Sequence, residues 1–170
     1  MVTRRQAREW VIMLLCECDQ NPPERLEDAI AAFWIQLEDI EKDSAEANEY
    51  GVKTVFSSRN PKHLASLDEM KAFAEERMRG VMKEREALDA ELGPFLQQWP
   101  LYRLGTVERN VLRLGAWEIS RCPSIPVPIA INEAVDLAKF FSETQSGKFV
   151  NGVLDRFAKS VAARPFTPGA

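Results

Sequence analysis

The sequence predicts an all-α fold, a bundle of about seven helices, and three observations support that prediction. Apolar residues recur with helical spacing through most of the 170 residues. Prolines, glycines and capping residues divide these stretches into segments of ordinary helical length. The segment FVNGVLD at 149–155 contains an Asn-Gly pair, a strong hairpin signal, but the flanking residues do not alternate beyond two positions on either side. No strand is therefore expected.

Two amphipathic helices and a loop are expected first. Residues 4–18 carry a helical apolar stripe, with three arginines clustered at its N-terminal end. Pro22 and Pro23 then begin a second helix, whose apolar positions are Leu26, Ile30, Phe33, Trp34 and Leu37. Residues 43–63 lose the periodicity and gather Ser, Asn, Gly and Pro, which is typical of a loop or an insertion.

Three further helices are expected between residues 66 and 141. Ser66 and Glu69 have the spacing of a capping box and open a long charged helix that ends near Gly93. Thr106 is a suitable N-cap for a helix through Trp117. The prolines of CPSIPVP, at 122–128, end that helix, and residues 130–141 form the next one.

The last helix contains the Asn-Gly pair. Phe149, Val150, Val153, Leu154, Phe157, Ala158 and Val161 form one wide apolar stripe, so Asn151 and Gly152 lie inside a helix. Both are poor helix formers, and Gly costs about 1 kcal/mol relative to Ala. We therefore expect a neighbouring helix to cross so closely that a side chain at Gly152 would clash, and Asn151 to bond to nearby backbone.

Composition and charge narrow the class of protein. The chain has no apolar run long enough to span a membrane and no secretion signal, so a cytoplasmic protein is expected. Cys16, Cys18 and Cys122 lack the spacing of zinc ligands and fit buried thiols, so no metal or other cofactor is expected. Residues 1–100 carry a net charge of −7 and residues 101–170 a net charge of +3, so the overall acidity does not exclude an anionic partner.

Three stretches carry a family resemblance. INEAVDLAKFFSETQSGKFVNGVLDR at 131–156, RRQARE at 4–9 and VERNVLRLGAWEI at 107–119 resemble the NusB family of bacterial transcription antitermination factors. The resemblance implies one NusB-like domain over residues 1–170, with an N-terminal helical subdomain at about 1–92 and a C-terminal one at about 93–164. It also implies a non-enzymatic adaptor. Such proteins bind boxA-type single-stranded RNA together with the ribosomal protein NusE and join the RNA polymerase antitermination complex, notably on ribosomal RNA operons.

Two groups of residues are candidates for binding RNA. Arg4, Arg5 and Arg8 match the arginine-rich segment of the family, although a short cation cluster is also typical of a solvated helix start. The second group lies in and beside the connector at 141–148, where cations, amides and free backbone N–H groups suit phosphates and base edges. It comprises Lys139, Phe141, Gln145, Ser146 and Lys148, of which Phe141 fits a core position equally well. We expect this connector to lie near the arginines.

Three residues are candidates for binding the protein partner. Glu108, Arg113 and Trp117 match family positions near the NusE-binding surface. Trp and Arg are enriched at interface hot spots, but Trp117 fits a buried position and Arg113 an internal salt bridge equally well. A family aromatic position near the end of the first helix is occupied by Cys16, so no stacking role transfers to it.

Two rival functions remain open. A helical protein-binding module would bind no RNA, and an accessory domain related to those of RNA cytosine methyltransferases would belong to an enzyme. The second requires a glycine-rich cofactor loop after a strand, and the sequence contains neither, so no catalytic role is expected. The sequence is compatible with a monomer and with a homodimer.

Overall fold

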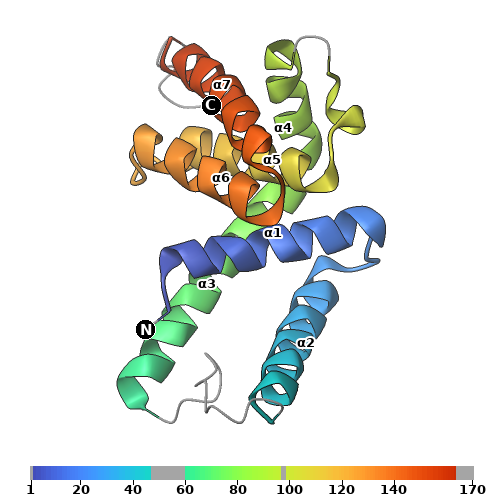
Figure 1. The fold of residues 1–170 in the computed structure, drawn as a ribbon, viewed down its shortest axis with the longest axis vertical. Coiled ribbons are helices and arrows are strands. Elements are labelled where there is room, and N and C mark those ends of the chain that lie inside the picture. Colours follow the sequence, from blue (N-terminus) through green and yellow to red (C-terminus); the bar gives the residue numbers. More distant parts are fainter. Residues whose placement is uncertain (1, 47–59, 97–98, 164–170) are drawn as a thin grey trace. The chain divides into compact units, whose positions relative to one another are not determined.

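The structure, a computed structural model, describes residues 2–46, 60–96 and 99–163. These residues form seven α-helices and two short 3₁₀ helices, η1 and η2, and contain no strand (Figure 1). The helix bounds are α1 Arg4–Gln20, α2 Leu26–Glu46, α3 Pro61–Lys83, α4 Arg85–Leu92, η1 Gly93–Phe95, η2 Leu101–Arg103, α5 Thr106–Arg121, α6 Val127–Phe141 and α7 Thr144–Ala162. The predicted all-α fold is confirmed.

The chain divides into two compact units, residues 1–79 and 80–170. The first holds α1, α2 and most of α3, and the second holds the end of α3 together with α4 to α7. The subdomain boundary predicted from the sequence lies near residue 92, C-terminal to this division. Across the described ranges, none of the helices combines the length and apolar character needed to cross a bilayer.

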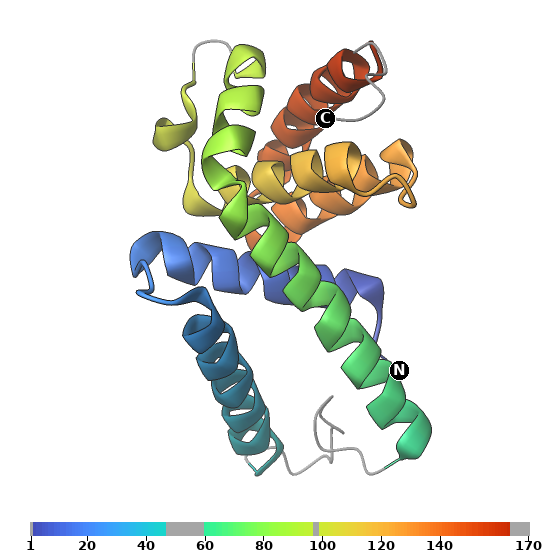
Figure 2. The same cartoon turned by 180° about the vertical axis from the view of Figure 1, so that it is seen from behind.

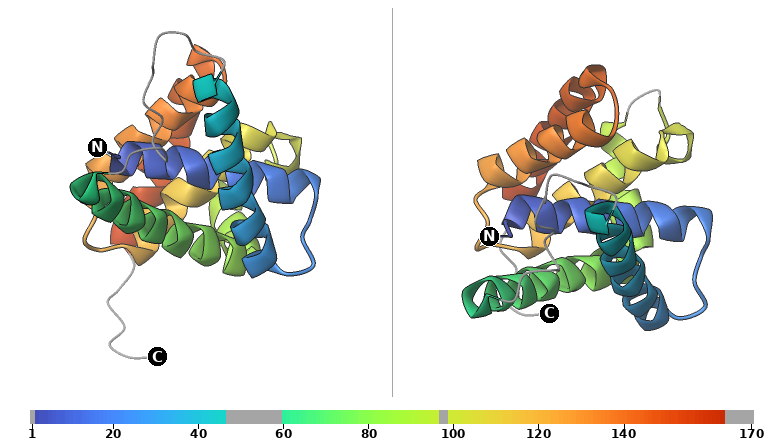
Figure 3. Two further views of the ribbon diagram at one scale, coloured as in Figure 1. Left: turned by 90° about the horizontal axis from the view of Figure 1, so that it is seen from below. Right: turned by 60° about the horizontal axis from the view of Figure 1, so that its bottom comes forward.

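In the first unit, α1 is the central apolar element. Thr3 caps it by accepting a hydrogen bond from the backbone N–H of Gln6 at 3.2 Å. The predicted stripe of α1 is buried, including Ala7, Val11 and Leu14. The chain turns after α1, and α2 runs away from it at a steep angle (Figures 1 and 3). The apolar periodicity of both helices therefore serves one shared core.

Long side chains join α2 to α3. The indole Nε1 of Trp34 donates to Glu75 at 2.9 Å, and Arg79 donates two hydrogen bonds to Glu27 at 2.7 and 2.9 Å. The ring of Trp34 also meets that of Trp10 edge-on, with the centroids 5.3 Å apart. These hydrogen bonds and ring contacts hold the three helices of the first unit together.

Two predicted features of this region are wrong. The long helix does not start at a capping box, because α3 begins at Pro61 and Ser66 lies inside it. The Ser66 hydroxyl donates instead to the carbonyl oxygen of Val2 at 3.4 Å. The predicted loop at 43–63 is shorter than expected at both ends, because α2 continues to Glu46. Its central part, 47–59, lies outside the described residues.

In the second unit, α5 packs against α4, α6 and α7, and α6 lies alongside α7 (Figures 1 and 2). A Cβ on Gly115 of α5 would lie 2.6 Å from Cδ1 of Leu154 and 3.4 Å from Cβ of Ala134. The missing side chain therefore lets α5 approach α6 and α7 closely. Arg121 ends α5 and pairs with Glu84 and Glu91, at the break between α3 and α4.

The packing expected at Gly152 is wrong. A Cβ on Gly152 would meet nothing within 4 Å, so no neighbouring helix requires this glycine. Asn151 is exposed, and its side chain makes no hydrogen bond in the described part of the chain. The helical assignment itself is confirmed, since α7 is continuous from Thr144 to Ala162 and buries the part of its predicted stripe from Val150 to Ala158. The close helix approach lies at Gly115 instead.

The expected cap of α5 is also wrong. Thr106 is the first helical residue, and Gly105 occupies the N-cap position. The Glu108 side chain folds back over Gly105, where a Cβ would collide with its carboxylate. The thiols of Cys18 and Cys122 are buried, as predicted, whereas that of Cys16 is only half-buried.

Candidate nucleic-acid and protein interfaces

The N-terminal arginines meet an aromatic ring that sequence analysis did not single out. The guanidinium carbons of Arg4, Arg8 and Arg77 lie 5.6, 5.2 and 3.3 Å from the centroid of the Phe73 ring. Arg8 and Arg77 are each only 3% exposed, whereas Arg4 is exposed. Cations over a ring face are attracted by its quadrupole. We call Arg4, Arg8, Arg77 and Phe73 the arginine cluster.

Each arginine in this segment has a different environment. Arg8 donates to the carbonyl oxygen of Arg4 at 3.4 Å, and Arg77 donates to that of Phe73 at 3.0 Å. Arg5 pairs with Glu9 at 3.1 Å on the same helix. Arg4 and the half-exposed Arg5 therefore present cations to solvent, while Arg8 supports the first turn of α1.

In the second unit, the turn between α6 and α7 brings the predicted connector residues to one end of the helix pair. Lys139, Gln145 and Lys148 are exposed, and Ser146 is half-buried. A Cβ on Gly147 would lie 2.8 Å from Cε of Lys139, so the glycine leaves room for the lysine stem across the first turn of α7. Lys139 and Lys148 thus accompany the N-terminus of a helix, which attracts anions.

The aromatic residue best exposed at this end is not the predicted one. Phe141 is half-buried, whereas Phe140 is 63% exposed. The two rings meet edge-on, with centroids 4.9 Å apart. The apolar stripe of α6 includes Phe141, so the same helical pattern indicates that the neighbouring Phe140 lies outside the core.

Glu108 joins the connector to α5. Its Oε1 accepts hydrogen bonds from the hydroxyls of Ser142 at 2.6 Å and Ser146 at 2.7 Å. Partial burial opposes ionisation of Glu108, but the two hydroxyl donors and a backbone hydrogen bond together outweigh this effect and lower the pKa of the carboxyl below its ordinary value. Glu108 therefore anchors the turn that carries Gln145, and no sequence spacing showed this contact.

Arg113 and Trp117 have the internal roles that the sequence left open. Arg113 donates two hydrogen bonds to Asp89, both at 2.7 Å, and a third to Asn110 at 3.1 Å. Trp117 is buried, and its ring fills the space beside Gly80, where a Cβ would collide with it. Their expected role in partner binding stays a prediction.

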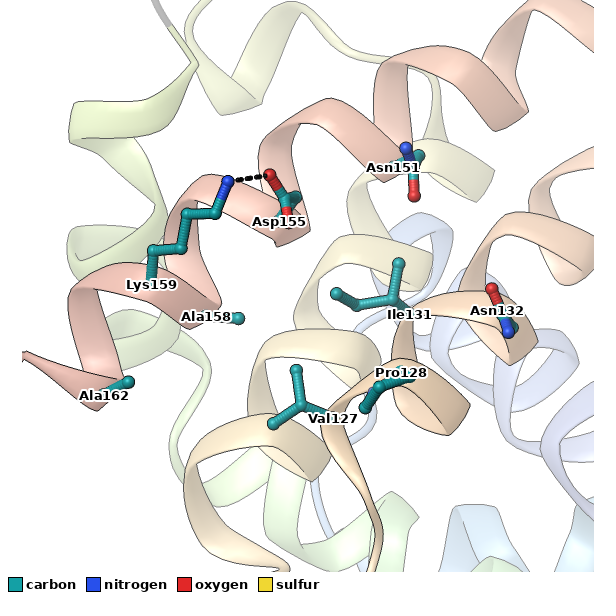
Figure 4. Close-up of a pocket in the computed structure, with 9 residues that line it drawn as sticks. All are labelled: Val127, Pro128, Ile131, Asn132, Asn151, Asp155, Ala158, Lys159 and Ala162. Carbon is teal, nitrogen blue, oxygen red and sulfur yellow. Dashed lines mark hydrogen bonds and ion pairs between the residues drawn. The ribbon is translucent and has the colours of Figure 1, made fainter.

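A groove between α6 and α7 extends from the middle of this helix pair to the end opposite the connector, with a volume of about 470 Å³. Its apolar lining includes Val127 and Ile131 of α6 and Ala158 and Ala162 of α7 (Figure 4). Asn132 of α6 and Asn151 of α7 line one end of it (Figure 4). We call this feature the α6–α7 groove.

The polar rim of the groove is electrically balanced. Lys159 Nζ lies 2.8 Å from a carboxylate oxygen of Asp155, and the two asparagine amides are neutral.

The arginine cluster belongs to the first unit, and the connector and the groove belong to the second. In the described part of the chain, no group of His, Cys, Asp and Glu has the arrangement of a metal site.

Comparison with known proteins places this chain in a family. The transcription antitermination protein NusB of Thermodesulfovibrio yellowstonii is 33% identical over 92% of this chain and 91% of its own length. The solved structure of T. maritima NusB is 31% identical, with a TM-score of 0.66, and the match covers 93% of this chain and 92% of that one. A structure of the antitermination factors NusB and NusE in complex with dsRNA has the same fold, with a TM-score of 0.66 at 24% identity over 92% and 96% of the two chains. The NusB family model matches residues 5–159, and the chain therefore belongs to the NusB family.

Proposed function

We propose that this protein is a transcription antitermination factor. It binds boxA-type single-stranded RNA together with NusE and joins the RNA polymerase antitermination complex, notably on ribosomal RNA operons. Full-length similarity to proteins named for antitermination supports the proposal. A relative of the same fold has been solved with NusE and dsRNA. The proposal assigns a binding role, without a catalytic step, to a cytoplasmic protein.

The observation that carries the RNA-binding part is the placement of cations beside aromatic rings. Arg4 lies exposed at the arginine cluster, and the exposed Lys139 precedes the exposed Phe140 on α6, with exposed Lys148 on the following helix. Single-stranded RNA requires cations for its phosphates and flat groups for its unstacked bases. Both units therefore supply the two kinds of group that such a ligand requires.

We assign distinct roles in RNA binding to the residues in and beside the connector. Lys139 and Lys148 bind phosphates, with help from the N–H groups of the first turn of α7. The exposed Gln145 reads a base edge, and Phe140 stacks on a base. Ser146 and Glu108 hold the turn in place through their hydrogen bond. Phe141 packs under Phe140 and supports it.

A salt series tests the proposal. The measured quantity is the Kd for a short U-rich boxA-like RNA, with and without purified NusE. For single strands, the slope of log K against log salt becomes shallower by about 0.7 for each phosphate that the protein no longer neutralises. The double variant R4E/R5E should weaken RNA binding and flatten this slope, while NusE binding is unchanged. Arg8 and Arg77 are left intact because their burial couples them to folding.

The matched control is R25E, which reverses an exposed arginine of the same unit outside the cluster. It should leave both the Kd and the slope close to those of the wild type. Wild-type binding that does not depend on salt, or equal weakening of RNA binding in R25E and R4E/R5E, would contradict the assigned phosphate-binding residues. Failure of the wild type to bind RNA in the presence of NusE would contradict the proposed function itself.

A further inference from the structure

Two aromatic side chains in the segment between η1 and α5 have no role in the RNA-binding scheme above. Trp99 and Tyr102 are 59% and 74% exposed, and the adjacent Arg103 is exposed as well. We call Trp99, Tyr102 and Arg103 the aromatic patch. We propose that it binds bases of single-stranded RNA on one side of the boxA-type element held at the connector. The inference rests on the proposed function and adds a further RNA contact in the second unit.

The first observation is the exposure of these rings. All four tryptophans lie in the described part of the chain, and Trp10, Trp34 and Trp117 are at most 8% exposed. Trp99 alone among them remains in solvent. Tyrosine and tryptophan bury a large apolar area when they pack. Two such rings that stay exposed three residues apart therefore leave much of this area available to a ligand.

The second observation is the fixed backbone that carries the aromatic patch. The N–H of Trp99 donates to the carbonyl oxygen of the buried Leu96 at 3.0 Å. The N–H of Arg103 donates to the carbonyl oxygen of Pro100 at 2.9 Å and closes η2. Because this backbone is already ordered, a ligand has to order only the side chains, which lowers the entropy lost on binding.

The third observation is the charge of Arg103. Its guanidinium carbon lies 5.9 Å from the centroid of the Tyr102 ring. Arg103 forms no ion pair with any residue in the described part of the chain. Proteins that bind single strands combine cations for the phosphates with aromatic rings for the bases. An uncharged apolar segment of a protein would use the rings but not the cation, so the aromatic patch favours RNA.

The position of the aromatic patch allows one RNA strand to contact it and the connector. Two steps along the chain separate Arg103 from Gly105, which spans at most about 7 Å. The carboxylate of Glu108 folds over Gly105 and accepts hydrogen bonds from Ser142 and Ser146 of the connector. Short contacts within the second unit therefore link the two surfaces, and a strand bound at the connector can continue to the aromatic patch.

Trp99 gives the inference a direct readout, because acrylamide quenches the fluorescence of exposed tryptophans more than that of buried ones. The probes are a short boxA-like RNA and the same RNA extended by about six uridines at its 5′ or its 3′ end, a length within the site size of single-strand-binding folds. One of the extended RNAs, at saturation, should lower the quenching of the full chain by about twofold through stacking. The short RNA should not. W99F should abolish this difference, which identifies Trp99 as its source.

Affinity measurements with NusE present test the second ring. Y102A removes one stacking surface and should weaken binding of that extended RNA about tenfold. Its Kd for the short RNA should stay at the wild-type value. Y102F keeps the ring and should bind both RNAs as the wild type does. The matched control is I129A, which shortens another exposed side chain of the second unit, 48% exposed, and should leave both Kd values unchanged.

R103A tests the cation. The slope of log K against log salt should become shallower by about 0.7 for the extended RNA, which corresponds to one phosphate, and should not change for the short RNA. Thermal unfolding of each variant shows that a loss of binding does not reflect a loss of fold.

Several results would overturn the inference. Acrylamide quenching that neither extended RNA lowers would remove the aromatic patch from the RNA path, as would equal binding of the extended RNA by Y102A and I129A. Shielding of Trp99 by NusE in the absence of RNA would assign the aromatic patch to a protein contact. Each of these results leaves the proposed function standing as long as the short RNA binds. Failure of the wild type to bind the short RNA in the presence of NusE would contradict both.

Discussion

The two ends of the α6–α7 pair differ in charge and in how they are held. The connector end carries exposed Lys139 and Lys148, and Glu108 anchors it through Ser142 and Ser146. The groove end is apolar with a neutral rim. A polyanion and a polypeptide require these two different surfaces. One pair of helices therefore presents two chemically different surfaces at its two ends.

The largest effect should come from reversing the charge of the connector end. K139E/K148E replaces two cations by anions where we place phosphates, and RNA affinity should fall about a hundredfold at low salt. The affinity for NusE should stay within twofold of the wild type, because both substitutions are confined to the connector end. Fluorescence anisotropy with labelled RNA measures the RNA affinity, and calorimetry measures the NusE affinity. A parallel loss of both affinities would contradict the assignment of these two lysines to RNA.

The next largest effect should come from a change in the packing of α5 against α6 and α7. G115A adds a Cβ only 2.6 Å from Leu154, at the point where α5 meets the helix pair. Overpacking of this kind costs about 2 kcal/mol. The free energy of unfolding, measured with urea, should fall accordingly. An unchanged midpoint would show that Leu154 moves aside without cost, and that close packing does not explain Gly115.

The anchor of the connector end should contribute less. E108A removes an ionised acceptor of two hydroxyls, and because the carboxylate is partly solvated we expect a loss of about 1.5 kcal/mol. RNA affinity should fall with it, since the turn loses its fixed position. E108Q keeps an acceptor oxygen and should lose less of both.

Glu108 should also make stability depend on pH. Its pKa is lowered in the folded state, so its contribution is complete above the ordinary carboxyl pKa and is lost as the pH falls through the folded value. The difference in melting temperature between wild type and E108Q should therefore shrink from pH 7 towards pH 3. A difference that grows on acidification would contradict the anchoring role.

The smallest effect should be a gain. G152A adds a methyl group where nothing lies within 4 Å and improves helix propensity, so unfolding free energy should rise by about 0.5 kcal/mol. G115A at the packed glycine should have the opposite sign. Destabilisation by G152A would mean that this glycine has a structural role in α7.

Helical periodicity predicted most of the fold because each apolar stripe is a property of one segment. The stripes of α1 and α7 are buried as expected. Contacts between segments were not predictable in the same way. The pattern marks Gly152 as unusual, but the glycine that a neighbour contacts is Gly115, and no local signal shows which helix crosses where.

The same limit applies to the candidate sites. Residue types and family matches single out exposed Arg4, Lys139 and Lys148, since cations on helix ends are recognisable locally. Phe73 and Arg77 escaped notice because their relation to Arg8 joins residues far apart in the sequence. The four-residue spacing of Phe73 and Arg77 on α3 was the available signal.

Hydrogen–deuterium exchange of the full chain, alone and with boxA-like RNA, tests the placement of RNA at the connector end most directly. We expect the RNA to slow exchange at 144–148 and to leave exchange at 151–162 unchanged. Protection of 151–162 by the RNA, with no change at 144–148, would contradict the account.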